Sequence, residues 1–469
     1  MFMNTNNSSD RVTQHLRALA AGAPPGTRLP SVRELMRELR VSPVTVQQAL
    51  ERLRREGVLE ARPGQGTFVA EIPAPAAAPA DMAWQSIALG PGRAVADGLA
   101  ALTALAPSRA HLLNIGYLPE DLQATALLGT AAARALRRPG VWGRMPLEGL
   151  AELRAWFAEA TGGAYAAHEV TICPGTQPAN AAAFRALAAA GDAVLVESPT
   201  YSGAIAAAQM AGLRVIPVPT DAEGVRPDLL EEAFRRSGAR LFYCQPNCAN
   251  PTGTVLSAAR RPEVLDVVVR AGAFLIEDDW AHEFYFDGPQ PPLLASAARD
   301  GHVVYVRSLT KCASPGLRIG AVCARGAALE RLRMARLVDD FFVPGIMQET
   351  ALQLVTAPAW PRHLRALRTS LRERRDLLAQ AVRSRLGTES LPNVPPGGLH
   401  LWVQLPRGVS DLEVVRAAAR RDVLVSAGRH WFPAEPPGTY LRLSFAAVEA
   451  DWVGEAVQVL AEAIAASGA

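Results

Sequence analysis

Short apolar runs alternate with helical stretches along most of the chain from about residue 109 onward. Six of these runs lie at 193–198, 213–219, 240–246, 273–279, 303–308 and 318–324. They are rich in β-branched residues and lack polar alternation, which is typical of strands buried on both faces of a parallel sheet. The stretches between them have a helical period. The pattern predicts an α/β domain with a mostly parallel sheet over residues 109–345.

The pattern changes beyond residue 345. An arginine-rich stretch at 362–386 has the period of one long helix, and apolar segments follow at 399–405 and 440–445. A long helix followed by separated strands predicts a smaller α+β domain at 346–469.

The N-terminal zone, residues 10–70, has the pattern of short helices followed by a hairpin. Apolar residues recur at helical spacing from Leu35 to Leu53. Ser31 and Ser42 stand where helices would begin, and serine is a favourable N-cap. The second helix is expected from about residue 43 to 56. The glycines of ARPGQGTFV then predict a tight hairpin turn, so the zone has the pattern of a winged helix-turn-helix.

A Pro/Ala-rich tract, AEIPAPAAAPADMA, lies between these zones. Such composition predicts an extended, semi-rigid linker. We therefore expect a multidomain chain with four parts: a helical N-terminal domain at 10–70, a linker at 71–108, a large domain at 109–345 and a small domain at 346–469.

Composition narrows the class of protein. With 49% hydrophobic and 20% charged residues the chain is globular, and its net charge of +3 says nothing about partners. No apolar run approaches the roughly 18 residues of a membrane span, and the polar start is unlike a secretory signal. The five cysteines are scattered without a zinc-binding pattern, so we expect no metal and a reducing, cytoplasmic environment.

Lys311 is the one lysine among 48 cationic residues; the other 47 are arginines. Arginine stays protonated in proteins, whereas a desolvated lysine amine can lose its proton and condense with an aldehyde. Lys311 is therefore a candidate to form an imine with a cofactor such as pyridoxal phosphate. The competing interpretation is a leftover surface lysine in an arginine-biased chain.

Polar groups suited to that cofactor follow five of the predicted strands, where ligands bind in α/β sheets. A helix start would bind phosphate, Tyr201 would stack on the ring, and Asn250 would donate to the phenolic oxygen. Asp279 would keep the pyridine nitrogen protonated. The predicted phosphate ligands are Gly175, Thr176, Gln177, Ser308, Thr310 and Arg318. Each motif alone could be an ordinary turn or a surface charge, but together they supply every group that the cofactor needs.

The second N-terminal helix has a polar side suited to the major groove of DNA. Gln47 and Gln48 can pair with adenine edges, and Arg33, Arg52 and Arg62 are candidates for phosphate contacts. The predicted DNA-contacting residues are Ser31, Arg33, Ser42, Thr45, Gln47, Gln48 and Gly66. A helical hairpin that docks on another protein is the alternative.

Both regions resemble known families. LPS-x-R, VS-x-x-TV and G-x-GT-x-V together resemble the GntR winged helix-turn-helix. The region from about 109 to 460 is similar to the fold-type I, class I/II aminotransferases, which depend on pyridoxal phosphate. That resemblance assigns Lys311 as the Schiff-base lysine and Arg442, in YLRLSF, as the residue that binds the substrate α-carboxylate.

Two positions depart from the aminotransferase pattern. His282 stands where the family usually has a tyrosine at the phenolic oxygen. Trp142 or Arg144 stands where a tyrosine usually reaches the neighbouring subunit's phosphate. These departures put full catalytic activity in question.

The fusion of the two modules resembles the MocR subfamily of bacterial regulators. The resemblance implies a head-to-tail homodimer that binds a double-stranded DNA operator and senses pyridoxal phosphate, an amino acid or an amine through aldimine chemistry. An active aminotransferase with an accessory DNA-binding domain is the first alternative. A binding module without cofactor is the second.

Overall fold

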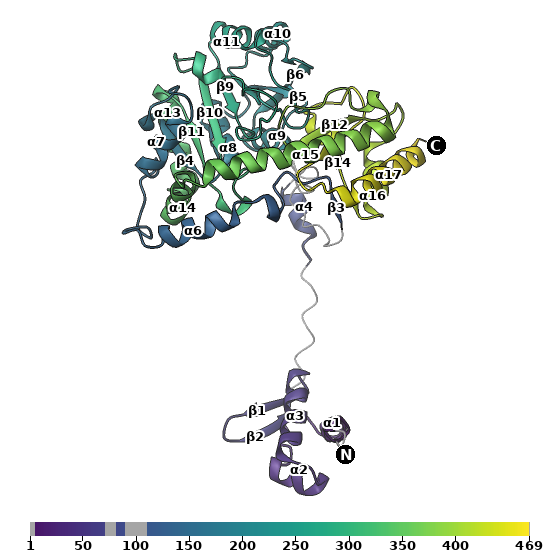
Figure 1. The fold of residues 1–469 in the computed structure, drawn as a ribbon. Coiled ribbons are helices and arrows are strands. Elements are labelled where there is room, and N and C mark those ends of the chain that lie inside the picture. The colour runs from purple at the N-terminus through teal and green to yellow at the C-terminus, as the bar shows by residue number, and fades with distance from the viewer. Residues whose placement is uncertain (1–4, 71–80, 90–109, 469) are drawn as a thin grey trace. The chain divides into compact units, whose positions relative to one another are not determined.

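The computed structural model describes residues 5–70, 81–89 and 110–468, and its contacts divide the chain into two compact units, Met1–Gly92 and Arg93–Ala469 (Figure 1). Most of the predicted linker lies outside the described residues. Its described part contains helix α4 (Ala83–Leu89) rather than extended chain. The sequence AWQSIAL has no proline or glycine to interrupt a helical turn, which accounts for this difference.

The N-terminal unit is a three-helix domain with a β-hairpin. The three helices are α1 (Thr5–Ala21), α2 (Val32–Leu39) and α3 (Pro43–Arg55), and the hairpin strands are β1 (Leu59–Arg62) and β2 (Gly66–Val69). Ser31 caps α2 through a capping box with Glu34, and Ser42 caps α3. Helix α1 packs on α3 and contributes Leu16 to the core, so the domain has one helix more than the two predicted.

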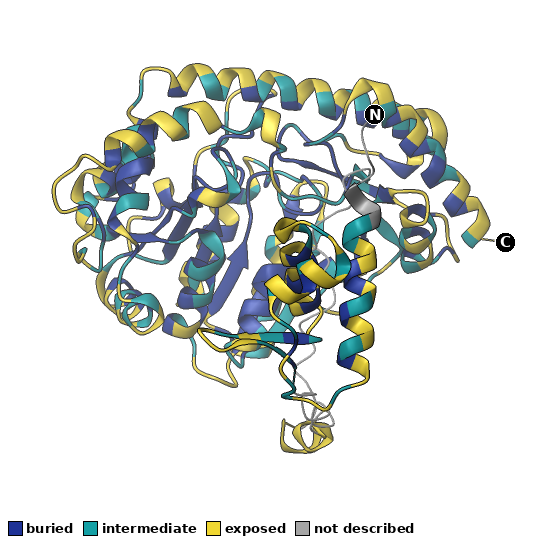
Figure 2. Ribbon diagram, turned by 90° about the horizontal axis from the view of Figure 1, so that it is seen from below, coloured by how far each residue is buried: buried dark blue, intermediate teal, exposed yellow. Residues whose placement is uncertain are grey.

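The larger unit is built on an eight-stranded sheet with strand order β4-β11-β10-β9-β8-β5-β6-β7. The strands are β4 (Val170–Cys173), β5 (Ala193–Ser198), β6 (Arg214–Asp221), β7 (Gly224–Val225), β8 (Leu241–Cys244), β9 (Phe274–Asp278), β10 (Val303–Ser308) and β11 (Gly320–Cys323). Figure 2 shows strands of this sheet buried beneath helices whose outer faces are exposed. The neighbouring pairs from β10 through β6 are parallel. The predicted mostly parallel sheet is thus confirmed.

One predicted strand runs against the rest. β11 pairs antiparallel with both β10 and β4. The connection from Ser308 to Gly320 contains only the short 3-10 helix η3 (Pro315–Leu317), and it is too short for the crossover that a parallel pair requires. The chain therefore turns back at the edge where the parallel strands end, and Lys311 lies in this turn.

Helices cover both faces of the sheet. The two layers form separate apolar clusters, one that includes residues of α8, α9 and α13 and one that includes residues of α7, α10, α11 and α12. Their bounds are α7 (Ala151–Glu159), α8 (Thr176–Leu187), α9 (Ser202–Met210), α10 (Pro227–Ser237), α11 (Arg260–Arg270), α12 (Leu294–Ala297) and α13 (Gly326–Asp340). Helices α6 (Thr125–Ala135) and α14 (Gly345–Val355) pack against each other.

The C-terminal part is a small α+β layer, as the pattern predicts. The 27-residue helix α15 (Trp360–Leu386) leads from α14 toward it and packs on α17 (Ala450–Ser467) (Figure 1). Its sheet has the order β12-β15-β14. The remaining elements are β3 (His111–Leu112), β12 (His400–Gln404), α16 (Asp411–Ala419), β13 (Val423–Leu424), β14 (Ser426–Ala427), the 3-10 helices η1 (Glu120–Leu122), η2 (Ala167–Glu169), η4 (Thr388–Ser390) and η5 (Gly428–Trp431), and β15 (Tyr440–Ser444).

Candidate functional site

The predicted site residues of the larger unit gather at one edge of the main sheet. β5, β8, β9 and β10 are parallel, and β4 runs in the same direction because two antiparallel pairings separate it from β10. The carboxyl ends of these five strands therefore meet at one edge. The N-terminus of α8, the start of α9 and the turn that carries Lys311 all follow from these ends.

Lys311 is partly buried at this edge, with its ammonium close to the segment after β3. Its Nζ donates to the carbonyl of Gly116 and lies 3.8 Å from the centre of the Tyr117 ring. Burial and the positive charges of Arg442 and Arg318 lower the pKa of Lys311 to about 7, and Asp278 opposes the shift. An amine with this pKa is available as a nucleophile near neutral pH.

A close-fitting cradle lies beside Lys311 at the N-terminus of α8. Gly175, the N-cap, has φ of 99°, and a Cβ added there would lie 2.8 Å from a terminal guanidinium nitrogen of Arg318. Arg318 in turn donates to the carbonyl of Pro174 at 2.9 Å. Only glycine allows this approach, and the backbone N–H groups that begin the helix with Thr176 and Gln177 form an anion-binding terminus.

The two predicted hydroxyls near the cradle differ in what they contact. Ser308 Oγ donates to the carbonyl of Ile319 at 3.0 Å and accepts from the N–H of Thr310 at 3.0 Å. Thr310 Oγ1 is buried and has no partner among the described residues. Because a buried hydroxyl normally has a partner, Thr310 is the better placed of the two to bind a ligand.

Asp278 and Asp279 face opposite sides of the sheet. The Asp278 carboxylate accepts from Asn180, Tyr243 and Gln245 at 2.6 to 3.2 Å, and its other oxygen is buried without a partner. Asp278 also acts on the charge of Lys311. The geometry thus favours Asp278, not the predicted Asp279, as the carboxylate that faces the site.

Asp279 lies in a separate buried cluster. Its carboxylate bonds His282 at 2.6 Å and Tyr305 at 2.7 Å. His282 is therefore held on the same side as Asp279, and also approaches Gln290 at 3.3 Å. These contacts hold the pKa of Asp279 below its ordinary value although burial opposes the shift. The predicted roles of Asp279 and His282 at the cofactor ring find no support in these contacts.

Tyr201 and Asn250 lie near the site, as predicted. The Tyr201 ring lies over Gly203, where an added Cβ would be 2.4 Å from it. Burial raises the pKa of Tyr201, and the charge of Asp278 adds to the shift. Asn250 is buried, and its Oδ1 lies 3.4 Å from a terminal nitrogen of Arg442. The amide of Gln177 donates to the carbonyl of Gly203 at 2.8 Å, so Gln177 supports the Tyr201 loop.

Arg442 projects from β15 into the same region and is only 1% exposed. It donates to the carbonyl of Asn114 at 2.6 Å and stacks 4.6 Å from the centre of the Trp431 ring. Among the described residues, no carboxylate acts on its charge, and burial lowers its pKa to about 9. A buried cation without an anion is costly unless a ligand supplies one.

The small domain is joined to the Tyr201 loop by a backbone hydrogen bond. The N–H of Thr200, which precedes Tyr201, donates to the carbonyl of Trp431 at 2.9 Å. The Trp431 ring is the one that Arg442 stacks on. Trp431 therefore links the loop that carries Tyr201 to Arg442, through its carbonyl on one side and its ring on the other.

Sequence reasoning missed two sets of residues here. They are Asp278 with its partners Asn180 and Tyr243, and His400. A signal for Asp278 was present, because strand residues alternate between faces, and Ile276 packs in the cluster beneath α8. His400 offered none, because long-range folding places it beside Arg442.

Trp142 and Arg144 lie on the loop between α6 and α7. Both side chains are exposed, Trp142 at 74%. Their predicted relation to a neighbouring subunit's phosphate stays a prediction.

The predicted DNA-contacting residues of the N-terminal unit lie along α2, α3 and the hairpin. Gln47 and Gln48 are exposed on α3, Arg33 is exposed on α2, and Thr45 is partly buried. The hydroxyls of Ser31 and Ser42 cap their helices. Gly66 pairs with Arg62 in the hairpin and has φ of 121°.

Two of the three arginines predicted to contact phosphates are already paired. Arg52 bonds Asp10 at 2.8 Å and Glu56 at 3.3 Å. Arg62 pairs with Glu60 and stacks on Phe68. Arg33 is thus the freest of the three candidates for a phosphate contact.

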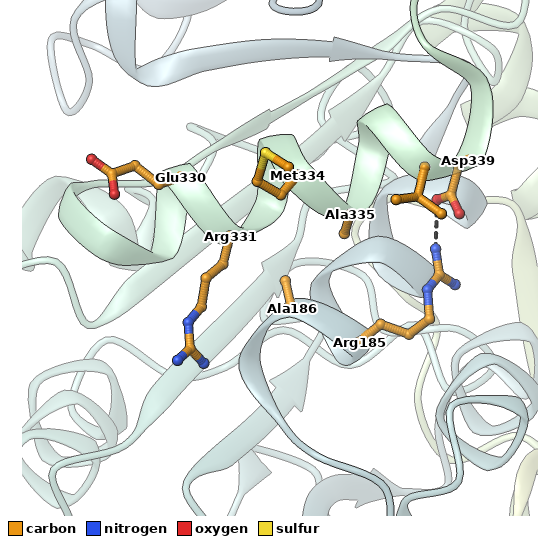
Figure 3. Close-up of a pocket in the computed structure, with 8 residues that line it drawn as sticks. Arg185, Ala186, Glu330, Arg331, Met334, Ala335 and Asp339 are labelled. Atoms are coloured by element: carbon orange, nitrogen blue, oxygen red, sulfur yellow. Dashed lines mark hydrogen bonds and ion pairs between the residues drawn. The ribbon is translucent and has the colours of Figure 1, made fainter.

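One hollow on the larger unit lies away from this site. It has a volume of about 670 Å³ and lies between α8 and α13, where Arg185 bonds Asp339 (Figure 3). None of the predicted site residues lines it, so it does not define the site. Among the described residues, no cluster of histidine, cysteine and acidic side chains is suited to a metal ion. Within that same part of the chain, no helix is long and apolar enough to cross a membrane.

Comparisons with known proteins agree with this architecture. The profile of the class I and II aminotransferases matches residues 113–460, and that of the bacterial regulatory proteins of the gntR family matches residues 8–69. The chain is 32% identical to a 2-aminoadipate transaminase of Thermus thermophilus, over 82% of this chain and 98% of that protein. It is 27% identical to the probable rhizopine catabolism regulatory protein MocR of Rhizobium meliloti, over 97% of this chain and 93% of that protein.

Among solved structures, the α-aminoadipate aminotransferase LysN from Thermus thermophilus superimposes with a TM-score of 0.71. It is 31% identical, and the match covers 76% of this chain and 92% of that one. The resemblances inferred from the motifs are confirmed. The chain belongs to the class I and II aminotransferase family, in the MocR arrangement with an N-terminal domain of the gntR family.

Proposed function

We propose that this protein is a transcription regulator that binds operator DNA through its N-terminal unit and senses a small amino compound through its aminotransferase-like unit. The observation that carries the proposal is the presence in one chain of an exposed glutamine pair on α3 and of a lysine with a pKa of about 7 in a site that also holds a phosphate cradle. A DNA-binding regulator acts in the cytoplasm, where DNA is accessible.

The site fits pyridoxal phosphate on three counts. The turn at Gly175 has no room for a Cβ, as a backbone that approaches a phosphate requires. The hydroxyl of Thr310 and one oxygen of Asp278 are buried without partners. When bound, pyridoxal phosphate supplies an aldehyde that condenses with amines and a protonated ring that accepts electrons.

Each side chain then has a defined task. Lys311 supplies the amine, Arg318 and the start of α8 bind the phosphate, and the Tyr201 ring supports one face of the cofactor. Asp278, rather than Asp279, is the proposed partner of the pyridine nitrogen because it faces Lys311. Asn250 is the proposed donor to the phenolic oxygen.

Arg442 is the proposed binding residue for the carboxylate of the effector. Its buried guanidinium lacks an anion, and a bound carboxylate would supply the missing charge. The effector changes DNA binding only if it binds the two conformations of the protein with different affinity. A head-to-tail homodimer, implied by the resemblance, would provide two DNA-binding units for one operator.

The DNA-binding half is tested by footprinting with the intact, cofactor-loaded chain at about 0.1 M salt, near the promoter of its own gene. A sequence-selective footprint is expected. It should be lost when Gln47 and Gln48 are both changed to Ala, because direct base contacts carry the sequence information. The control is Gln404→Ala, an exposed glutamine in the larger unit. Equal binding to unrelated DNA would overturn the proposal.

The alternative is a catalytically active aminotransferase. The similarity to a transaminase over 98% of that protein's length favours it. Continuous turnover of an amino donor with a keto acid would support the enzyme, whereas a half-reaction that stops after one equivalent would support the sensor. Both measurements use absorbance of the cofactor-loaded protein, and Lys311→Arg is the inactive control.

A further inference from the structure

His400 is a buried histidine that the proposed function has not used. It begins β12 beside β15 and is 3% exposed. Its ring stacks on Trp280, with the two ring centres 5.7 Å apart and the planes at 20°. Its Nε2 lies 3.4 Å from a terminal nitrogen of Arg442. The ring is thus packed directly against the proposed carboxylate-binding residue.

The direction of this contact determines the charge of the ring. Every nitrogen of a guanidinium is a donor, so Nε2 of His400 must be the acceptor and the ring must be neutral. Two cations face it, Arg442 from β15 and Lys311 from the turn after β10, and together with burial they hold the pKa of His400 well below its ordinary value. The flat neighbour on its other side, Trp280, carries no charge. Protonation is therefore unfavourable while no anion is bound.

Arg442 has unused hydrogen-bonding capacity on the side of His400. One terminal nitrogen is firmly bonded to the Asn114 carbonyl at 2.6 Å. The other makes only two long contacts, 3.4 Å each, to Asn250 and His400. Its Nε is buried without a partner, as is Nδ1 of His400. A carboxylate that displaces the long contacts would lie within reach of both Arg442 and Nε2 of His400.

We propose that His400 is a positioning residue coupled to protons: its neutral ring holds Arg442 while the site is empty, and it takes one proton from solvent when a carboxylate binds, so that Nε2–H donates to that carboxylate. The inference rests on the proposed function, because it uses the same site. The inference also narrows the effector of the proposed function to molecules that carry a carboxylate, in preference to simple amines. The bond formed is a hydrogen bond between Nε2–H and a carboxylate oxygen, and solvent supplies the proton.

The coupling has a definite sign. The bound anion offsets the charge of Arg442, so the pKa of His400 is higher in the complex than in the free protein. Binding is then accompanied by proton uptake, and affinity rises as pH falls, by at most about tenfold per pH unit for one proton. The rise ends in acid, where the ligand's own carboxylate becomes protonated, near pH 4 to 5 by its ordinary value of about 4.

The test uses the cofactor-loaded protein and 4-methylpentanoate, a carboxylate without an amine, so the link to Lys311 stays intact. Calorimetric titration at pH 6.5 in two buffers of different ionisation enthalpy gives the number of protons taken up. Absorbance of the cofactor reports separately any proton gained at the Lys311 nitrogen. Affinity is also measured from pH 5.5 to 8.

The variants are His400→Asn, which can still accept from Arg442, and His400→Phe, which keeps the stack on Trp280. The control is His302→Asn, a partly buried histidine that bonds the Ala273 carbonyl and is not in contact with Arg442. We expect proton uptake and the pH slope to persist in wild type and the control and to be lost in both His400 variants.

Three outcomes decide the matter. Loss of the slope in both folded His400 variants, with 4-methylpentanoate still bound, supports the coupling. The same slope and proton number in wild type and His400→Asn overturns it while leaving the proposed function intact. Failure of wild type to retain cofactor or to bind the carboxylate overturns the proposed function, and the coupling with it.

Discussion

The cofactor-free protein should show a lysine amine that loses its proton near neutral pH. Burial and two arginines place the pKa of Lys311 at about 7, against 10.5 for an ordinary lysine. The perturbation that isolates the charge effect is Arg442→Met, which removes one of the two cations and keeps most of the volume of the side chain. The pKa of Lys311 should rise in this variant, because less positive charge opposes protonation.

The magnitude follows from the two pKa values. A group with a pKa of 7 is about half deprotonated at pH 7, whereas one near 10.4 is deprotonated in roughly 0.04% of molecules. The free-amine fraction is therefore larger by about three orders of magnitude.

The assay exploits the composition of the chain. Because Lys311 is the one lysine, an amine-reactive reagent labels one side chain, and mass spectrometry of the peptide that contains it gives the rate. Rates are measured from pH 6 to 11 and compared with those of the same lysine in urea-denatured protein, which corrects for the pH dependence of the reagent.

The expected rate profile of the folded protein has its midpoint near pH 7, and that of Arg442→Met lies higher. A midpoint above about 9.5 in the folded wild type would show that Lys311 is solvated like a surface lysine. The assignment of Lys311 as the activated amine would then be refuted, and its uniqueness would reflect composition alone.

Two further predictions concern the cofactor. Asp278→Asn should weaken the binding of pyridoxal phosphate at least about tenfold in an absorbance titration. Asp279→Asn should still bind the cofactor, but its melting temperature should fall because the buried cluster is broken. Weak binding in Asp279→Asn and normal binding in Asp278→Asn would instead assign Asp279 as the ring partner. Gly175→Ala should also weaken binding at least about tenfold, because its Cβ would displace Arg318. Gly163→Ala is the matched control, since its φ is also positive but nothing lies within 4 Å of its Cβ; equal losses in both would reduce the effect to backbone strain.

Much of the architecture was predictable because burial leaves a strong mark on sequence. The runs at 193–198 and 303–308 are strands with those same bounds, since unbroken apolar runs can be satisfied only between two layers of helices. The long helix at 362–386 begins two residues earlier than its pattern. The local sequence pattern was sufficient wherever burial alone determines the type of element.

The structure favours other residues than the predicted ones where a decision depended on which face a residue occupies or on contacts distant in sequence. Adjacent acids at a strand end look alike in sequence, and only the alternation that places Ile276 under α8 separates Asp278 from Asp279. His400 gained its neighbour Arg442 through pairing of β12 with β15. The residues around His400 in the sequence do not predict that pairing.

The backbone hydrogen bond between Thr200 and Trp431 limits how the C-terminal layer can move against the large sheet. The same two parts are also joined where the N–H groups of Phe286 and Asp287 donate to the carbonyl of Pro396 and that of Gly398 donates to the carbonyl of Phe284. These bonds restrain the inner side of the C-terminal layer, whereas α16 and the end of α17 lie beyond the small sheet (Figure 1) and are the parts freest to move. Closure over a ligand would thus be registered as displacement at the outer helices, and a spectroscopic probe belongs there instead of beside the arginine.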